Sequence, residues 1–140
     1  MSSVRQLTSI SSQAALEVVA AAQRAAEASG QRSAIAVVDA AGQLCAFARM
    51  DGAAIQAGQI AQDKAYTAAG FGMPTAQWHD LLAQDAPMAA GAPTGIARFI
   101  PFGGGLPLVV DGQVVGGVGV SGGHWTEDVK VAEAGAAALA

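Results

Sequence analysis

Apolar residues recur at two different spacings along the chain, and the changes between them mark where helices give way to strands. Stretches in which alanine, leucine and valine share one helical side predict four helices, at 11–29, 54–69, 76–84 and 127–139. Short apolar, β-branched runs predict five strands, at 34–39, 43–50, 98–102, 106–110 and 113–120. The order α-β-β-α-α-β-β-β-α favours an α+β fold, with a five-stranded antiparallel sheet flanked by helices.

Turn and cap residues separate these elements. Asp111-Gly112 lies between two apolar runs and predicts a two-residue type I′ turn, in which both residues need positive φ. Asp39 is expected to serve the turn of an earlier hairpin by accepting hydrogen bonds from nearby backbone N–H groups. Residues 85–95 hold two prolines and two glycines, so we expect a loop there. Thr75 and Thr126 are the expected N-caps of the two later helices.

The composition narrows the class of protein. At 140 residues the chain has the length of one domain, taken as residues 1–140. It is 52% hydrophobic and only 13% charged, and its alanine-rich helix faces predict a homo-oligomer. The net charge is -4 and the basic residues are scattered, which argues against nucleic-acid binding. With no apolar leader and no run long enough to cross a membrane, we expect a cytoplasmic protein.

Cysteine and histidine are too few to indicate a metal centre. Cys45 lies in a predicted strand and is expected to be a small buried hydrophobe. His79 falls on an amphipathic helix and is expected at the surface or at an interface. Two separated histidines, one cysteine and scattered acids lack the ligand spacing of a zinc or iron site, so no metal site is expected.

Two glycine clusters are the first candidates for a binding site. Gly103, Gly104 and Gly105 follow Phe102, and Ser121, Gly122 and Gly123 end the last predicted strand just before a helix. Bare backbone N–H groups at such corners bind anions, and a helix N-terminus favours a carboxylate. The alternative is structural, because a tight strand connection also needs glycine where φ is positive.

Four charged or titratable side chains are the other candidates. Arg49 can pair with a carboxylate or phosphate, and Asp51 can act as a base or cap the following helix. Lys64 lies among alanines and is either a solvated charge or a buried amine, with Asp51 or Asp63 as its partner. His124, beside glycine-rich backbone, is the best residue for proton transfer or iron ligation, although a lone histidine is more often structural.

Four segments resemble the GlcG/HbpS family, the heme-binding HbpS-like domain that also occurs beside some corrinoid adenosyltransferases. The segments are VVDAAGQLCAFARMDGA (37–53), QDKAYTAA (62–69), FGGGLPLVVDGQVVGGVGVSGG (102–123) and EDVKVAEAG (127–135). The resemblance implies a profilin-like fold that assembles into dimers or higher oligomers. It also implies heme as a possible cofactor, whereas the residues themselves establish none.

Two functions follow as hypotheses. The first is an oligomeric small-molecule-binding protein whose ligand is heme, another tetrapyrrole or a small anionic metabolite. The alternative is a cofactor-free isomerase, hydratase or lyase that acts on a small organic acid or aldehyde. In that enzyme Asp51 or His124 would be the base, Lys64 and Arg49 would hold the carboxylate, and glycine N–H groups would stabilise an enolate.

Overall fold

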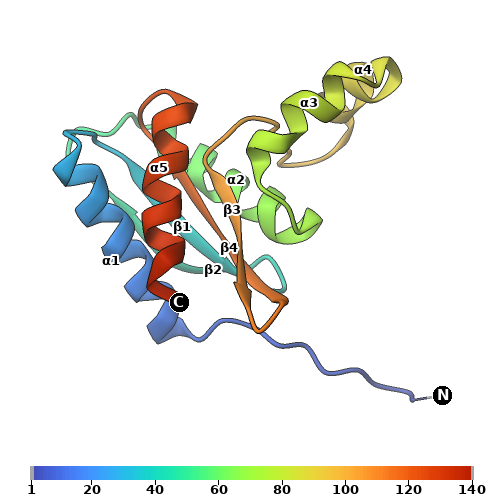
Figure 1. The fold of residues 1–140 in the computed structure, drawn as a ribbon, viewed down its shortest axis with the longest axis horizontal. Coiled ribbons are helices and arrows are strands. Elements are labelled where there is room, and N and C mark those ends of the chain that lie inside the picture. Colours follow the sequence, from blue (N-terminus) through green and yellow to red (C-terminus); the bar gives the residue numbers. More distant parts are fainter. Residues whose placement is uncertain (1, 140) are drawn as a thin grey trace.

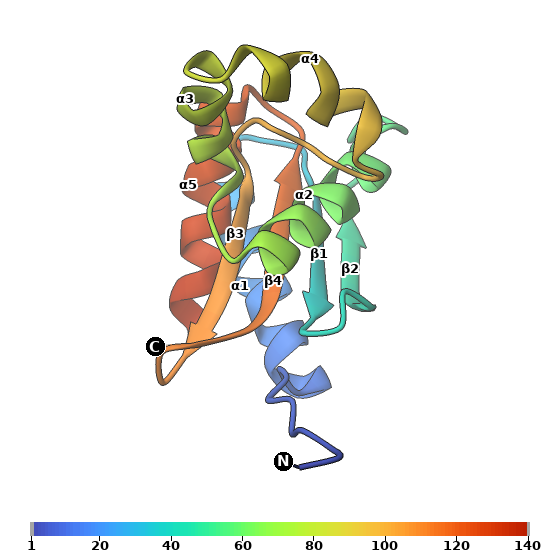
Figure 2. The same cartoon turned by 90° about the vertical axis from the view of Figure 1, so that its right-hand side faces the viewer.

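The computed structural model describes residues 2–139 and contains one antiparallel sheet of four strands in the order β2-β1-β4-β3. The strands are β1 (Ala34–Asp39), β2 (Leu44–Arg49), β3 (Gly105–Val110) and β4 (Gln113–Ser121). Figures 1 and 2 show the two central strands, β1 and β4, between the two hairpin partners. The β3–β4 turn has φ of 51° at Asp111 and 75° at Gly112, which confirms the predicted turn.

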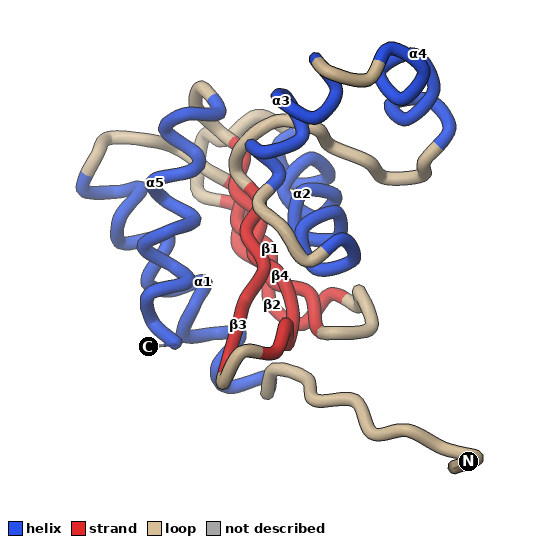
Figure 3. Tube along the Cα trace, turned by 45° about the vertical axis from the view of Figure 1, so that its right-hand side comes forward, coloured by secondary structure: helices blue, strands red, loops and turns tan. Residues whose placement is uncertain are grey.

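Helices cover both faces of the sheet (Figure 3). Helices α1 (Ser12–Ala28) and α5 (Trp125–Ala136) pack on one face, and α2 (Ala57–Phe71) packs on the other. Strand β1 serves both layers by alternation, because Ile35 and Val37 join the α1/α5 cluster while Ala36 and Val38 join the α2 cluster. The α2 side consists mainly of alanine and of the glycines of β4, so the helix backbone comes close to the strand.

Residues 98–102 do not form the predicted fifth strand; the sheet has four strands within the described chain. Arg98 has a positive φ of 62°. The Thr67 hydroxyl on α2 donates to the Arg98 carbonyl (3.0 Å) and accepts from the Ile100 N–H (3.2 Å). The segment is therefore bound to a helix rather than to a strand edge, and its Phe99 ring packs against the rings of Phe71 and Trp78.

Residues 85–95 are also corrected, because they contain a helix rather than a loop. Helix α4 (Ala86–Gly95) is capped by Asp85, whose carboxylate accepts from the Met88 N–H (3.0 Å). Its first proline lies in the first turn, where a missing N–H costs nothing. Together with α3 (Trp78–Ala83), this helix projects beyond the end of the sheet (Figure 1).

Both predicted threonine caps are wrong. The Thr75 hydroxyl is buried and accepts from the Gly105 N–H (2.9 Å), so it joins the short η1 turn (Thr75–Gln77) to β3. Helix α5 begins at Trp125, two residues earlier than expected, and its N-cap is His124. After α5 the chain closes with the η2 turn (Ala137–Leu139).

The prediction for Asp39 is confirmed, whereas Cys45, which was expected to be buried, is only partly buried. The Asp39 carboxylate accepts from the Ala41 N–H (2.9 Å) and the Gln43 N–H (3.0 Å) in the β1–β2 turn. Cys45 is partly buried against the core, and burial, with a smaller effect of the Asp39 charge, raises the pKa of its thiol. A raised pKa is the opposite of what a nucleophilic cysteine needs. Between residues 2 and 139, no helix is both long and apolar enough to cross a bilayer.

Candidate functional site

Lys64 is the most deeply buried charged side chain among the candidates. It lies on the sheet side of α2, and only 1% of its side chain is exposed. Its Nζ donates to the Val120 carbonyl on β4 (2.8 Å) and to Asp128 Oδ2 on α5 (3.1 Å). The expected partners were wrong, since Asp51 does not contact Lys64 and Asp63 pairs with Arg98 Nε (2.8 Å).

The two glycine corners meet at this ion pair. The enzyme hypothesis requires such proximity, because it places Lys64 and the glycine N–H groups around one substrate. Gly104 has φ of 125°, and a Cβ there would lie 2.6 Å from Lys64 Nζ. The Gly104 carbonyl accepts from the Val120 N–H (2.9 Å), and the Gly123 N–H donates to Asp128 Oδ1 (3.0 Å). The Phe102 ring lies 5.1 Å from Lys64 Nζ. Glycine here allows strand, helix and lysine to pack closely.

Burial lowers the pKa of the Lys64 ammonium, and the charge of Asp128 opposes that change. A lysine whose pKa is lower in the folded than in the unfolded state contributes stability above the unfolded pKa, and this contribution is lost as pH falls through the folded pKa. We therefore expect the free energy of unfolding to rise as pH approaches 10.5. Urea unfolding over an alkaline pH series measures this slope, and a variant with Lys64→Met and Asp128→Asn should lack it.

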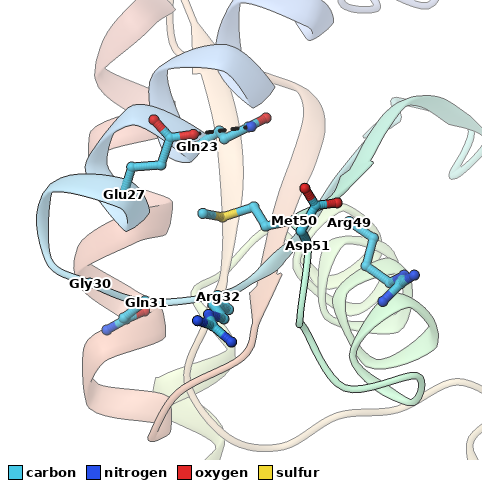
Figure 4. Close-up of a pocket in the computed structure, with 8 residues that line it drawn as sticks. All are labelled: Gln23, Glu27, Gly30, Gln31, Arg32, Arg49, Met50 and Asp51. Carbon is cyan, nitrogen blue, oxygen red and sulfur yellow. Dashed lines mark hydrogen bonds between the residues drawn. The ribbon is translucent and has the colours of Figure 1, made fainter.

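A polar cavity of about 490 Å³ lies between the end of α1 and the end of β2 (Figure 4). This is the same end of the sheet as the glycine corner at residues 121–123. It is lined by Gln23, Glu27, Gly30, Gln31, Arg32, Arg49, Met50 and Asp51. Arg49 also donates to the Ala53 carbonyl (2.9 Å). Asp51 does not cap α2, which begins six residues later at Ala57 with Gln56 as N-cap, so the capping interpretation is wrong.

An apolar cleft of about 360 Å³ separates the outer side of α2 from the segment that follows α4. Its lining residues are Tyr66, Thr67, Gly70, Phe71, Ile96, Ala97 and Phe99. The Arg98 guanidinium stacks on the Tyr66 ring at 3.9 Å, which places a positive charge beside the apolar surface. Neither this cleft nor the polar cavity is lined by Lys64 or by the glycine corners.

His124 is held by its own loop. Its Nδ1 accepts from the Thr126 N–H (3.3 Å) and lies 2.8 Å from the Thr126 hydroxyl, while its ring is tilted on Trp125 at 5.5 Å. Within residues 2–139, histidine, cysteine and acidic side chains do not gather in threes as a metal site requires. The structure therefore places Asp51, Lys64 and His124 in three different surroundings.

Sequence reasoning missed Asp128 as the partner of Lys64. The signal was present, because helical spacing puts Asp128 on the same side as Val131 and Ala132, which are buried. Glu27, Arg32 and Gln31 were missed as cavity residues. No local pattern marks them, since they come from the end of a helix and from a connecting segment.

These features define a class of protein: a four-stranded antiparallel sheet with helices on both faces and two surface depressions of ligand size. The chain belongs to the HbpS-like family, described as "Haem degrading protein HbpS-like", whose match covers residues 10–137. This confirms the family resemblance seen in the sequence.

Relatives match over most of the chain. Protein GlcG of Escherichia coli K12 is 39% identical over 112 residues, which are 80% of this chain and 81% of GlcG. A double mutant of HbpS from Streptomyces reticuli has a TM-score of 0.88 and 36% identity, covering 98% of this chain and 91% of HbpS. The crystal structure of a PduOC:heme complex has a TM-score of 0.85 and 27% identity, covering 94% and 96% of the two chains.

Proposed function

We propose that this member of the HbpS-like family is a small-molecule-binding protein whose ligand is heme or a related tetrapyrrole, bound at the apolar cleft. The observation that carries the proposal is the cleft itself, with three aromatic rings on its walls, from Tyr66, Phe71 and Phe99. Its volume of about 360 Å³ lies in the range of small-molecule sites. The heme complex of a structural relative supports the same ligand class.

The residues present fit heme in two respects. Tyr66 is 38% exposed, and a tyrosine oxygen is one of the axial ligands that proteins offer to heme iron. Arg98 lies against Tyr66, and a guanidinium pairs well with a carboxylate such as a heme propionate. Heme bound here would supply a redox-active iron, and Tyr66 and Arg98 are the residues that would hold it. Assembly with further copies belongs to this proposal and is supported by the exposed side chains of Phe47, Ile55 and Trp125.

Hemin added to the purified protein is expected to bind saturably and to shift the Soret band. Tyr66→Phe removes the oxygen ligand and should change the spectrum of the bound heme. Phe71→Leu should weaken binding up to about tenfold, because the contact of an aromatic ring with a flat aromatic ligand contributes up to about 1.5 kcal/mol. Absorbance titration measures both effects.

Phe102→Leu is the matched control, since Phe102 is 41% exposed and Phe71 is 48% exposed, but only Phe71 lines the cleft. Unchanged hemin affinity in Phe102→Leu supports the cleft. If Phe102→Leu weakens binding and Phe71→Leu does not, the ligand lies at the glycine corner, as the sequence hypothesis for Phe102, Gly103–Gly105 and Ser121–Gly123 has it. Failure of hemin to bind saturably contradicts the heme proposal.

The cofactor-free enzyme stays as the alternative, favoured by one observation. Lys64 is a buried amine with a lowered pKa, and perturbed titrating groups gather at active sites. Its Nζ is, however, engaged by Asp128 and by the Val120 carbonyl, and the two proposed bases lie elsewhere. A substrate would therefore have to displace Asp128 to reach the amine, which makes binding the better-supported function.

A further inference from the structure

The polar cavity at the end of α1 is a second candidate binding site, and it shares no residue with the apolar cleft. Figure 4 shows Gln23 and Glu27 on the α1 side and Arg49 and Asp51 on the β2 side, with the Met50 side chain reaching from β2 toward α1. We propose that this cavity binds a small zwitterion, a molecule that carries both a carboxylate and an ammonium group.

The charged groups of the cavity are not paired with one another. The structure has three ion pairs within residues 2–139, and none of them includes Glu27, Arg32, Arg49 or Asp51. These four side chains lie around an open volume of about 490 Å³. Arg49 donates one hydrogen bond to the Ala53 carbonyl and Glu27 accepts one from Gln23, and neither contact neutralises the charge.

Arg32 lies close to the backbone of the turn that follows β2. Gly52 has φ of 84°, and a Cβ there would lie 2.8 Å from both Cδ and Nη1 of Arg32. The arginine side chain therefore lies across the Asp51–Gly52 turn at a spot that only glycine leaves open. Its side chain is exposed, so the guanidinium is accessible to the carboxylate of a ligand.

The balance of charge decides between ligand classes. Two guanidiniums and two carboxylates line the cavity, so a simple anion is attracted by one pair and repelled by the other. A zwitterion satisfies both, with its carboxylate on Arg32 and its ammonium on Glu27. The sequence hypothesis had a small anion as the ligand, with Arg49 pairing with it. The charge balance of the cavity favours a zwitterion instead.

An uncharged lining residue positions one of the two acids. Gln23 Nε2 donates to Glu27 Oε1 (3.4 Å) and so holds that carboxylate at the cavity wall.

The test is a matched ligand series on the intact protein. Isothermal calorimetry with ω-amino acids of increasing chain length, from glycine to ε-aminocaproate, is compared with the alkanoate and the alkylamine of each length. Saturable binding of an amino acid, with neither matched compound binding, is the expected result. Equal binding of the alkanoate, or no binding by any member of the series, overturns the proposal without any variant.

Variants then locate the site. Arg32→Gln and Glu27→Gln should each weaken binding about tenfold, because a charge-assisted hydrogen bond contributes about that much. Arg24→Gln and Glu17→Gln are the controls, since both residues are exposed on α1 and neither lines the cavity. An equal loss in either control places the binding elsewhere. Hemin affinity should not change in Arg32→Gln, which separates this site from the heme proposal.

Discussion

Replacing Lys64 with methionine is expected to lower the free energy of unfolding by about 3–5 kcal/mol. The exposed fractions of the Lys64 and Asp128 side chains are 1% and 2%, so the change leaves a buried carboxylate without its counter-charge. The Val120 carbonyl also loses its donor. Urea denaturation followed by circular dichroism measures the difference. Such a loss would show that Lys64 has a structural role, which the enzyme hypothesis does not include.

The matched control is Lys130→Met. Lys130 pairs with Glu127 on the same helix as Asp128, but the side chains are 72% and 45% exposed. Exposed pairs contribute little, so we expect a loss of less than about 1 kcal/mol. Adding Asp128→Asn to Lys64→Met should recover part of the loss, because the amide carries no charge and its oxygen can still accept from the Gly123 N–H. If Lys64→Met is no more harmful than Lys130→Met, the buried pair does not form in solution.

Gly119→Ala is expected to destabilise the protein by about 3 kcal/mol or more, which is the upper end of the cost of overpacking. A Cβ at this position in β4 would collide with the Ala61 carbonyl and lie 2.6 Å from the Ala65 N–H, both in α2. These are backbone atoms, so no side chain can rotate away and the helix must move off the sheet. Thermal and urea denaturation measure the loss.

Gly91→Ala tests whether the effect comes from the collision. Gly91 lies in α4, is exposed, and a Cβ there meets nothing within 4 Å. Alanine is the better helix former, so this variant should be as stable as the parent or up to about 1 kcal/mol more stable. A Gly119→Ala protein of parental stability would mean that α2 does not lie directly on β4.

The glycine-rich strand shows where prediction from sequence reached the right element and left its role open. Its turn at Asp111-Gly112 follows from local chemistry, and the structure has it. For the glycine clusters at 103–105 and 121–123, which flank this hairpin, the sequence left open either anion binding by the backbone or a tight strand connection. In the structure Gly119 and Gly104 are close to α2 and to Lys64, so they allow close packing between layers. Both interpretations need a bare Cα, and only the neighbouring element distinguishes them.

The polar cavity shows the same limit for the site. Arg49 and Asp51 were singled out because they lie where a strand ends, and both line the cavity. Glu27 and Arg32, which complete its charge balance, belong to other elements and carry no motif. Their relevance appears only when the end of α1 is placed against the end of β2.

The sequence by itself determined what depends on near neighbours: the three longer helices α1, α2 and α5, the two hairpins, the turn at residues 111–112, and membership in the HbpS-like family. Only the tertiary structure decided which element each side chain contacts. Lys64 and Asp128 are 64 positions apart, and residues 98–102 bind α2 instead of a strand edge. The physical reason is that periodicity, capping and turn chemistry act over a few residues, whereas burial and charge pairing depend on contacts that only the folded chain creates.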